Sequence, residues 1–113
     1  MEERQNDADE GVILAITTFP NSEVSRQIGT QLVESQLAAC VNLIPGVESI
    51  YSWKGKVERD QEVLCLIKTT RDRWDSLAAW VREHHPYEEP ELIVIPVEAG
   101  LEGYLEWVRR AVS

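Results

Sequence analysis

The apolar positions of this chain form four strand-like segments. Residues 11–19 (GVILAITTF) are an apolar, β-branched run that ends at Pro20, which predicts a strand buried on both faces. Residues 40–54 and 57–70 are extended segments joined by a Lys-Gly-Lys turn, which predicts a long hairpin. Residues 91–99 (ELIVIPVEA) are a fourth predicted strand. Together these segments indicate one four-stranded sheet.

Three further segments have the spacing of amphipathic helices. We expect the first to be capped by Asn21 or Ser22, and the second to be capped by Asp72. The second is predicted to end near His84-His85, because a proline follows this pair. The third helical segment follows the fourth predicted strand. The residues expected to face the core are Val24, Ile28, Leu32 and Val33 in the first helix, Trp74, Leu77, Ala78 and Val81 in the second, and Leu101, Tyr104, Leu105, Val108 and Val112 in the third.

The order of these segments is β-α-β-β-α-β followed by a helix, which predicts an α+β fold. Two right-handed βαβ units that share an antiparallel sheet give the ferredoxin-like sandwich, with the strands in the order fourth, first, third, second. Proline lacks the N–H that a central strand needs, so it belongs on edge strands or at bulges. Pro45 and Pro96 fall in the second and fourth segments, which are the predicted edges.

Composition limits the classes of protein to consider. We expect a single domain at residues 11–113, preceded by a flexible acidic tail at residues 1–10, which hold five acids and one base. The net charge is −9 and no basic patch is evident, so nucleic acid is not an expected partner. No apolar run is long enough to span a membrane. Two cysteines and no visible secretion signal favour the cytoplasm.

Several motifs resemble the CutA (divalent-cation tolerance) family in the same order and spacing. They are LAACVNLIPGVESIYSWKGKVE at residues 37–58, KTT at 68–70, HHPYEEPELIVIPVEAG at 84–100 and YLEW at 104–107. The resemblance implies a ferredoxin-like subunit in a tight homotrimer, with the hairpin reaching onto a neighbour. It also implies a role in tolerance to divalent metals and no known reaction. We therefore expect a protein that is not an enzyme and has no organic cofactor.

His84 and His85 are the predicted metal ligands. Imidazole nitrogen suits Cu(II) and other divalent cations. The resemblance implies copper ligands at this pair together with a cysteine in the first strand, a position that Thr17 occupies here. Cys40 is a further candidate ligand, although its small neighbours also fit a buried core thiol. The alternative for the histidines is a structural role at the end of a helix.

Aromatic and charged side chains on the hairpin predict contacts beyond the monomer. Tyr51 and Trp53 share one face of a strand, and Trp80 and Trp107 lie off their helical stripes, which favours subunit contacts. A polar cleft is predicted where the hairpin meets the neighbour's HPYEEP loop; the alternative is a set of solvated charges. Its candidate ligand-binding residues are Trp53, Glu58, Glu62, Lys68, Tyr87 and Glu89.

Other proteins of this fold remain to be weighed, because fold alone does not determine function. An RNA-recognition domain needs aromatic residues on its third strand, and residues 62–70 (EVLCLIKTT) contain none. The alternative that stays open is a PII-like signalling trimer, which binds a small metabolite in the clefts between subunits. Basic residues and glycines in the cleft would favour it.

Overall fold

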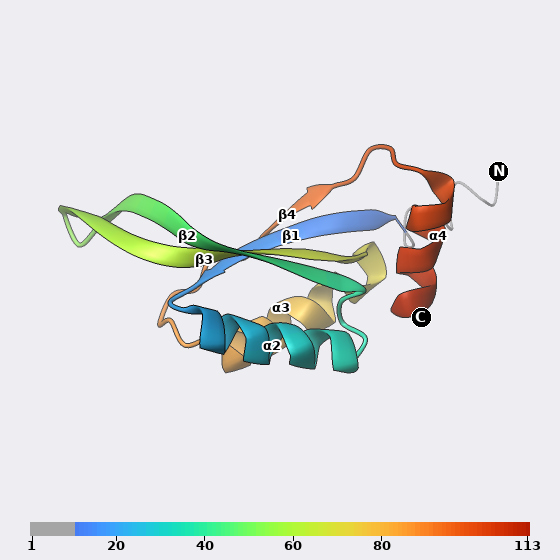
Figure 1. Cartoon of the computed structure of the whole chain (residues 1–113), viewed down its shortest axis with the longest axis horizontal. Helices are drawn as coiled ribbons and strands as arrows, with labels where there is room; N and C mark the ends of the chain where they lie inside the picture. Colours follow the sequence, from blue (N-terminus) through green and yellow to red (C-terminus); the bar gives the residue numbers. More distant parts are fainter. Residues whose placement is uncertain (1–10) are drawn as a thin grey trace.

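The computed structural model describes residues 11–113; the predicted acidic tail at residues 1–10 lies outside the described part. The chain forms a four-stranded sheet with two helices against one face and a third helix at one end (Figure 1). The elements are β1 (Val12–Phe19), α2 (Ser22–Glu34), β2 (Cys40–Trp53), β3 (Lys56–Thr70), the 3₁₀ turn η1 (Arg71–Arg73), α3 (Trp74–His84), β4 (Ile93–Pro96) and α4 (Glu102–Ala111). None of the helices in this described part is long and apolar enough to cross a membrane.

The strand order is β2-β3-β1-β4, and every neighbouring pair is antiparallel. This is the predicted order read from the other edge, so the α+β ferredoxin-like arrangement is confirmed. The central pair β1 and β3 is in register along the whole of β1, from Val12 opposite Thr70 to Phe19 opposite Val63. β2 and β3 continue past the end of β1 as a long two-stranded arm (Figure 1).

The arm contains one register shift. Ile44 lies opposite Leu64, whereas Val47 lies opposite Glu62, so β2 has one more residue than β3 across this step. The Pro-Gly pair at positions 45–46 fills the step, and its glycine has a φ of 75°, which lies in the left-handed region that glycine adopts without strain. Pro45 lies at this bulge in β2 and Pro96 lies in β4, so both prolines are on edge strands, as predicted.

The main core lies between the sheet and the two helices α2 and α3. Phe19, Leu32 and Leu77 are fully buried there, together with the helix-facing side chains of β3. Gly29 brings α2 close to β2, because a Cβ atom at this position would lie 3.2 Å from Val41 Cγ1. Val33 was expected to face this core but is exposed, since the small residues of α2 take the remaining buried positions.

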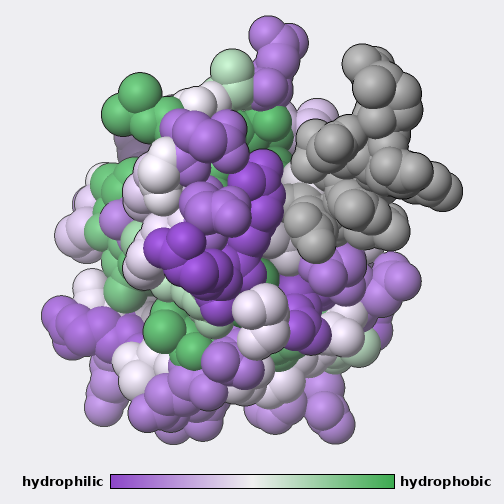
Figure 2. All heavy atoms as spheres, turned by 90° about the vertical axis from the view of Figure 1, so that its right-hand side faces the viewer, coloured by the Kyte–Doolittle hydropathy of each residue, from purple (hydrophilic) through white to green (hydrophobic). Residues whose placement is uncertain are grey.

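α4 packs against one end of the other sheet face. Val108 and Val112 are buried there with Val12. Leu101 and Tyr104 were predicted to face inward, and this was wrong: Leu101 is 84% exposed because it precedes the first turn of α4, and Tyr104 is exposed on its surface. Figure 2 views the molecule from the end that carries α4 and shows hydrophilic side chains over most of that end, with apolar ones along one side.

Two predicted boundaries were also wrong. Asp72 does not cap α3: it lies in η1 and accepts a hydrogen bond from Thr70 Oγ1, and α3 begins at Trp74 without a side-chain cap. The fourth strand is shorter than residues 91–99, because only Ile93–Pro96 pair with β1. Residues before it belong to the loop described below.

Candidate functional site

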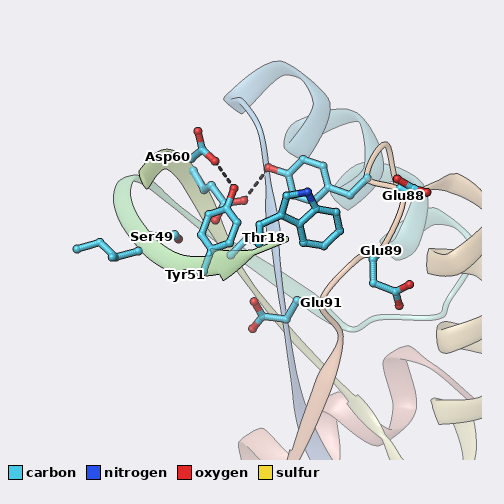
Figure 3. Close-up of a pocket in the computed structure, with 11 residues that line it drawn as sticks. Thr18, Ser49, Tyr51, Asp60, Glu88, Glu89 and Glu91 are labelled. Carbon is cyan, nitrogen blue, oxygen red and sulfur yellow. Dashed lines mark hydrogen bonds between the residues drawn. The ribbon is translucent and has the colours of Figure 1, made fainter. Parts of the chain in front are cut away.

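A cavity of about 610 Å³ opens between the arm and the loop that joins α3 to β4. Ligand pockets commonly have volumes of roughly 300–1,000 Å³. Figure 3 shows Ser49, Tyr51 and Asp60 on the arm, and Glu88, Glu89 and Glu91 of the loop on the other side of this space. One chain supplies both walls.

The arm wall carries two aromatic side chains and two carboxylates. Cross-strand neighbours in an antiparallel ladder point to the same face, which gathers these groups on one side of the arm. Tyr51 Oη donates a hydrogen bond to Asp60 Oδ2, and this bond is the main reason that the pKa of Tyr51 is raised to about 12. The side chains that form this wall are Ser49, Ile50, Tyr51, Trp53, Asp60 and Glu62.

The loop wall is attached to the arm by a second tyrosine. Tyr87 Oη donates a hydrogen bond to Glu62 Oε2 over 2.6 Å. Burial and this bond to Glu62 raise the pKa of Tyr87, so the phenol stays protonated as a donor. Glu88, Glu89 and Glu91 follow along the same loop and line the cavity.

His85 positions the loop against β1. Its Nδ1 accepts a hydrogen bond from the Tyr87 N–H over 3.1 Å, and its Nε2 donates to the Thr18 carbonyl over 2.8 Å. Its ring stacks on Phe19 with 4.8 Å between the centroids. Burial lowers the pKa of His85, although the Thr18 carbonyl and Glu62 act in the opposite direction. The neutral imidazole is therefore a structural link between the core and the cavity.

The electrostatic character of the cavity is negative. Five carboxylates and no basic side chain are among the described residues that line it. Three aromatic rings, those of Tyr51, Trp53 and Tyr87, complete the walls. Thr18 of β1 forms the floor, and its side chain is nine-tenths buried. A small cation is the kind of ligand that this combination attracts.

Four of the six predicted cleft residues come together here. Trp53, Glu62, Tyr87 and Glu89 line the cavity, and its two walls belong to the same chain; the contact of the hairpin with a neighbour's loop stays a prediction. Glu58 and Lys68 do not line it. Glu58 lies opposite Tyr51, closer to the tip of the arm. Lys68 lies towards the other end of β3, with its Nζ 5.7 Å from the centre of the Tyr104 ring.

The sequence-based prediction of the cleft missed seven of the eleven lining residues, including the floor residue Thr18 and the carboxylates Asp60, Glu88 and Glu91. The signal for Asp60 was present, since it is two residues from Glu62 in a strand and therefore on the same face. The loop acids gave no comparable signal, because only the bonds of His85 and Tyr87 turn the loop towards the arm.

The predicted metal ligands are arranged differently from one another. His84 stacks on Trp80 with 4.0 Å between the centroids, and its Nδ1 lies 2.8 Å from the Trp80 carbonyl oxygen. Both ring nitrogens of His85 have protein partners, as described above. Cys40 lies opposite Lys68, at the other end of β3 from the cavity. Within residues 11–113, no group of three or more His, Cys, Asp or Glu side chains is placed to hold a metal ion.

The stability of the fold should fall as the pH decreases below about 6.5, the ordinary pKa of histidine. Because the pKa of His85 is lowered in the folded state, the folded state binds fewer protons than the unfolded state in this window, and acid favours unfolding. We expect the thermal midpoint of the wild type to drop more between pH 7.5 and pH 5 than that of His85→Gln. His84→Gln is the matched control and should keep the wild-type dependence; an unchanged pH dependence in His85→Gln would contradict this role.

Comparison with known proteins agrees with the fold and adds the family. The family model described as CutA1 divalent ion tolerance protein matches residues 13–111. The chain therefore belongs to the CutA divalent-ion tolerance family, as its motifs predicted.

Individual relatives are similar over most of the chain. Protein CutA of Homo sapiens is 52% identical over 99 residues, which cover 88% of this chain and 55% of the human protein. The divalent-cation tolerance protein CutA of Thermus thermophilus is 46% identical over 96 residues, covering 85% of this chain and 93% of that protein. The crystal structure of CutA from Xylella fastidiosa superposes with a TM-score of 0.88 at 37% identity, covering 91% of this chain and 99% of that chain. The chain thus spans about half the length of the human relative.

Proposed function

We propose that this protein contributes to divalent-cation tolerance as a non-catalytic protein that binds cations in the cavity. The observation that carries the proposal is a lining of five carboxylates without a described basic residue. Carboxylates at the walls of a cleft concentrate cations there. A binding role is favoured over a catalytic one because His85 and the two tyrosines act through hydrogen bonds that shape the cavity.

The same proposal includes a homotrimer. The sheet face opposite α2 and α3 carries apolar side chains, and Ile44, Ile93 and Ile95 remain exposed on it. Burying such a face between subunits would stabilise an assembly. The arm extends well beyond the helices (Figure 1), which suits contact with a neighbouring copy. Of the tryptophans predicted at subunit contacts, Trp80 is instead partly buried against the monomer core.

A cytoplasmic location is also part of the proposal. Cys40 and Cys65 are both free thiols, which suits a reducing compartment. Burial raises the pKa of Cys65 to about 12, so this thiol stays protonated and belongs to the core rather than to a metal site.

The function is tested by calorimetric titration of the full chain with CuCl₂, ZnCl₂ and 1,4-diaminobutane as cations, and with ATP as an anion. We expect cation binding that weakens at least tenfold in the cavity variant Glu88→Gln/Glu89→Gln/Glu91→Gln, because three charges are removed from the lining. The control variant Glu34→Gln/Glu83→Gln/Glu98→Gln removes the same charge from exposed positions elsewhere and should bind like the wild type. Equal cation binding by both variants would contradict a cavity site.

Copper at His84 and His85 is tested in the same titration. The structure offers one nitrogen of this pair, His84 Nε2, that has no protein partner among the described residues, whereas both nitrogens of His85 are engaged. The residues therefore fit a chelating pair poorly unless the loop rearranges. His84→Ala/His85→Ala should lose any Cu(II) binding that depends on imidazole, and Cu(II) affinity equal to that of the wild type would remove the pair from the site.

The PII-like alternative is a trimer that binds a small metabolite between subunits. The observation that favours this alternative is that four of the predicted cleft residues line one cavity. The charge of the lining opposes an anionic metabolite, because like charges repel. Binding of ATP in the absence of cation binding would support this alternative instead.

A further inference from the structure

We infer that the cavity is built for an organic cation that carries more than one ammonium group, of the linear polyamine class, rather than for a bare divalent metal ion. This inference rests on the proposed cation-binding function and names the class of ligand at the same site. Four features of the cavity support it: the spread of its carboxylates, its free carboxylate oxygens, its aromatic rings and its floor.

The carboxylates are spread too widely for one metal ion. A calcium ion takes six to eight oxygen ligands at about 2.3–2.6 Å, and magnesium takes six at about 2.0–2.1 Å. Although five carboxylates line the cavity, the described residues contain no group of three potential ligands close enough to hold an ion. In Figure 3 the loop carboxylates stand apart from Asp60 across the open space. Ammonium groups joined by methylene chains can neutralise both walls at once.

The arm carboxylates retain acceptor capacity for such a ligand. Asp60 uses Oδ2 to accept from Tyr51, and Glu62 uses Oε2 to accept from Tyr87. The second oxygen of each makes no hydrogen bond to another described residue. Since an ammonium group has three donors and no acceptor, it complements a lining made of carboxylate oxygens.

The aromatic rings distinguish an organic cation from a metal ion. Trp53 is 43% exposed, and its indole lines the cavity beside the rings of Tyr51 and Tyr87. An ammonium group over an aromatic face is attracted by the ring, as Lys54 Nζ already is at 5.8 Å from the centre of the Trp53 ring, and methylene groups gain by covering the rings. These rings offer no ligand atom to a metal ion other than phenol oxygens that already donate to carboxylates.

The floor of the cavity contains a polar group without a protein partner. Thr18 is only 8% exposed and lines the cavity, yet its hydroxyl makes no hydrogen bond to any residue in the described part of the chain. Its neighbour Thr17 faces the other side of β1, where its hydroxyl lies 3.2 Å from His85 Nε2. Thr18 Oγ1 is not among the fully buried unpaired atoms of the described residues, so it is open to the cavity, where a ligand donor that reaches the floor is expected to bond it.

The experiment compares amines with divalent metal ions on the full chain, and 1,4-diaminobutane is the amine whose charge equals that of the metal ions. The probes are 1,4-diaminobutane and spermidine, with CaCl₂ and CuCl₂ as divalent ions and 1,4-butanediol as the neutral analogue, at fixed ionic strength. Binding is followed by calorimetry and by tryptophan fluorescence, because Trp53 lines the site. We expect the amines to bind at least tenfold more tightly than either metal ion at the cavity, and the diol not to bind.

Matched variants connect the binding to the cavity. Trp53→Leu should weaken amine binding by about 3- to 20-fold, the range expected for one cation–π contact. Trp107→Leu is the control, because Trp107 is 42% exposed and lies on α4, away from the cavity. Thr18→Val preserves the shape of the side chain and should weaken amine binding by about fivefold through the loss of one hydrogen bond. Light scattering and circular dichroism verify that each variant keeps the wild-type assembly and fold.

The outcomes separate this inference from the proposed function. One outcome would overturn the organic ligand but not the proposed cation-binding function: metal ions bind as tightly as the amines, and the Glu88/Glu89/Glu91 variant loses this affinity. Failure of every cation to respond to the cavity variants would overturn both. Should the triple glutamate variant not fold, Thr18→Val and Trp53→Leu decide the inference, and unchanged amine affinity in both would refute it.

Discussion

Replacement of Phe19 by alanine is expected to lower the free energy of unfolding by about 3–5 kcal/mol. Phe19 is completely buried at the end of β1, in the core between the sheet and the helices α2 and α3. Its ring also stacks on His85, so the substitution leaves a void and removes the support of the loop that lines the cavity. Domains of this size have a total stability of about 5–15 kcal/mol, which makes this a large loss.

Urea unfolding at a fixed protein concentration measures the effect. Val57→Ala is the control, because Val57 is 76% exposed and its truncation should change the stability by less than about 0.5 kcal/mol. Phe19→Leu keeps most of the volume and should lie between the two. A loss below about 1.5 kcal/mol in Phe19→Ala would show that the core collapses around the missing ring, and the cavity would then be independent of it.

Placing a lysine at Ile16 is expected to dissociate the proposed trimer. Ile16 lies on the helix-free face of the sheet, between Leu66 of β3 and Ile93 of β4. In the monomer this side chain is only partly buried, so a lysine can reach solvent at small cost. In an assembly that buries this face the same charge would be desolvated without a partner, which costs several kcal/mol.

Light scattering across a dilution series measures the assembly. Wild type should remain trimeric to low micromolar concentration, while Ile16→Lys should sediment and scatter as a smaller species or fail to stay folded. Gln27→Lys adds the same charge to the exposed surface of α2 and should leave the assembly unchanged. A trimer in both variants would move the interface to another face, and a folded monomer in the wild type would refute the trimer.

The fold was predictable because its central strands are dictated by local chemistry. The apolar, proline-free runs of β1 and β3 identify the two inner strands, and Pro45 and Pro96 identify the edges. The errors occurred where several local choices have similar free energies. Asp72 has a side chain that commonly caps helices, but it lies in the 3₁₀ turn η1 and its carboxylate accepts a hydrogen bond from Thr70 Oγ1 instead. Leu101 has the spacing of a core residue but lies before the helix begins.

The site was predictable in part because half of it follows from strand alternation. Trp53 and Glu62 lie on the arm, where alternate residues share a face, and both were identified. The other half depends on contacts between distant segments. Tyr87 reaches Glu62 from 25 positions away, and the link from His85 to Thr18 spans 67 positions. No local pattern reveals such bonds, and the link to Thr18, together with the bond from the Tyr87 N–H, engages both ring nitrogens of His85.

The one-residue bulge at positions 45–46 has a consequence for how this arm tolerates change in length. Before it, even-numbered residues such as Ile44 share a face with Leu64; beyond it, odd-numbered residues such as Val47 share that face with Glu62. The extra residue therefore reverses, from the bulge to the tip of the arm, which face of β2 the odd-numbered and even-numbered side chains occupy. Loss of a single residue there would turn both aromatic side chains of β2 to the opposite side while preserving the composition of the strand. Length variation in this arm can keep the cavity only when residues are gained or lost in pairs.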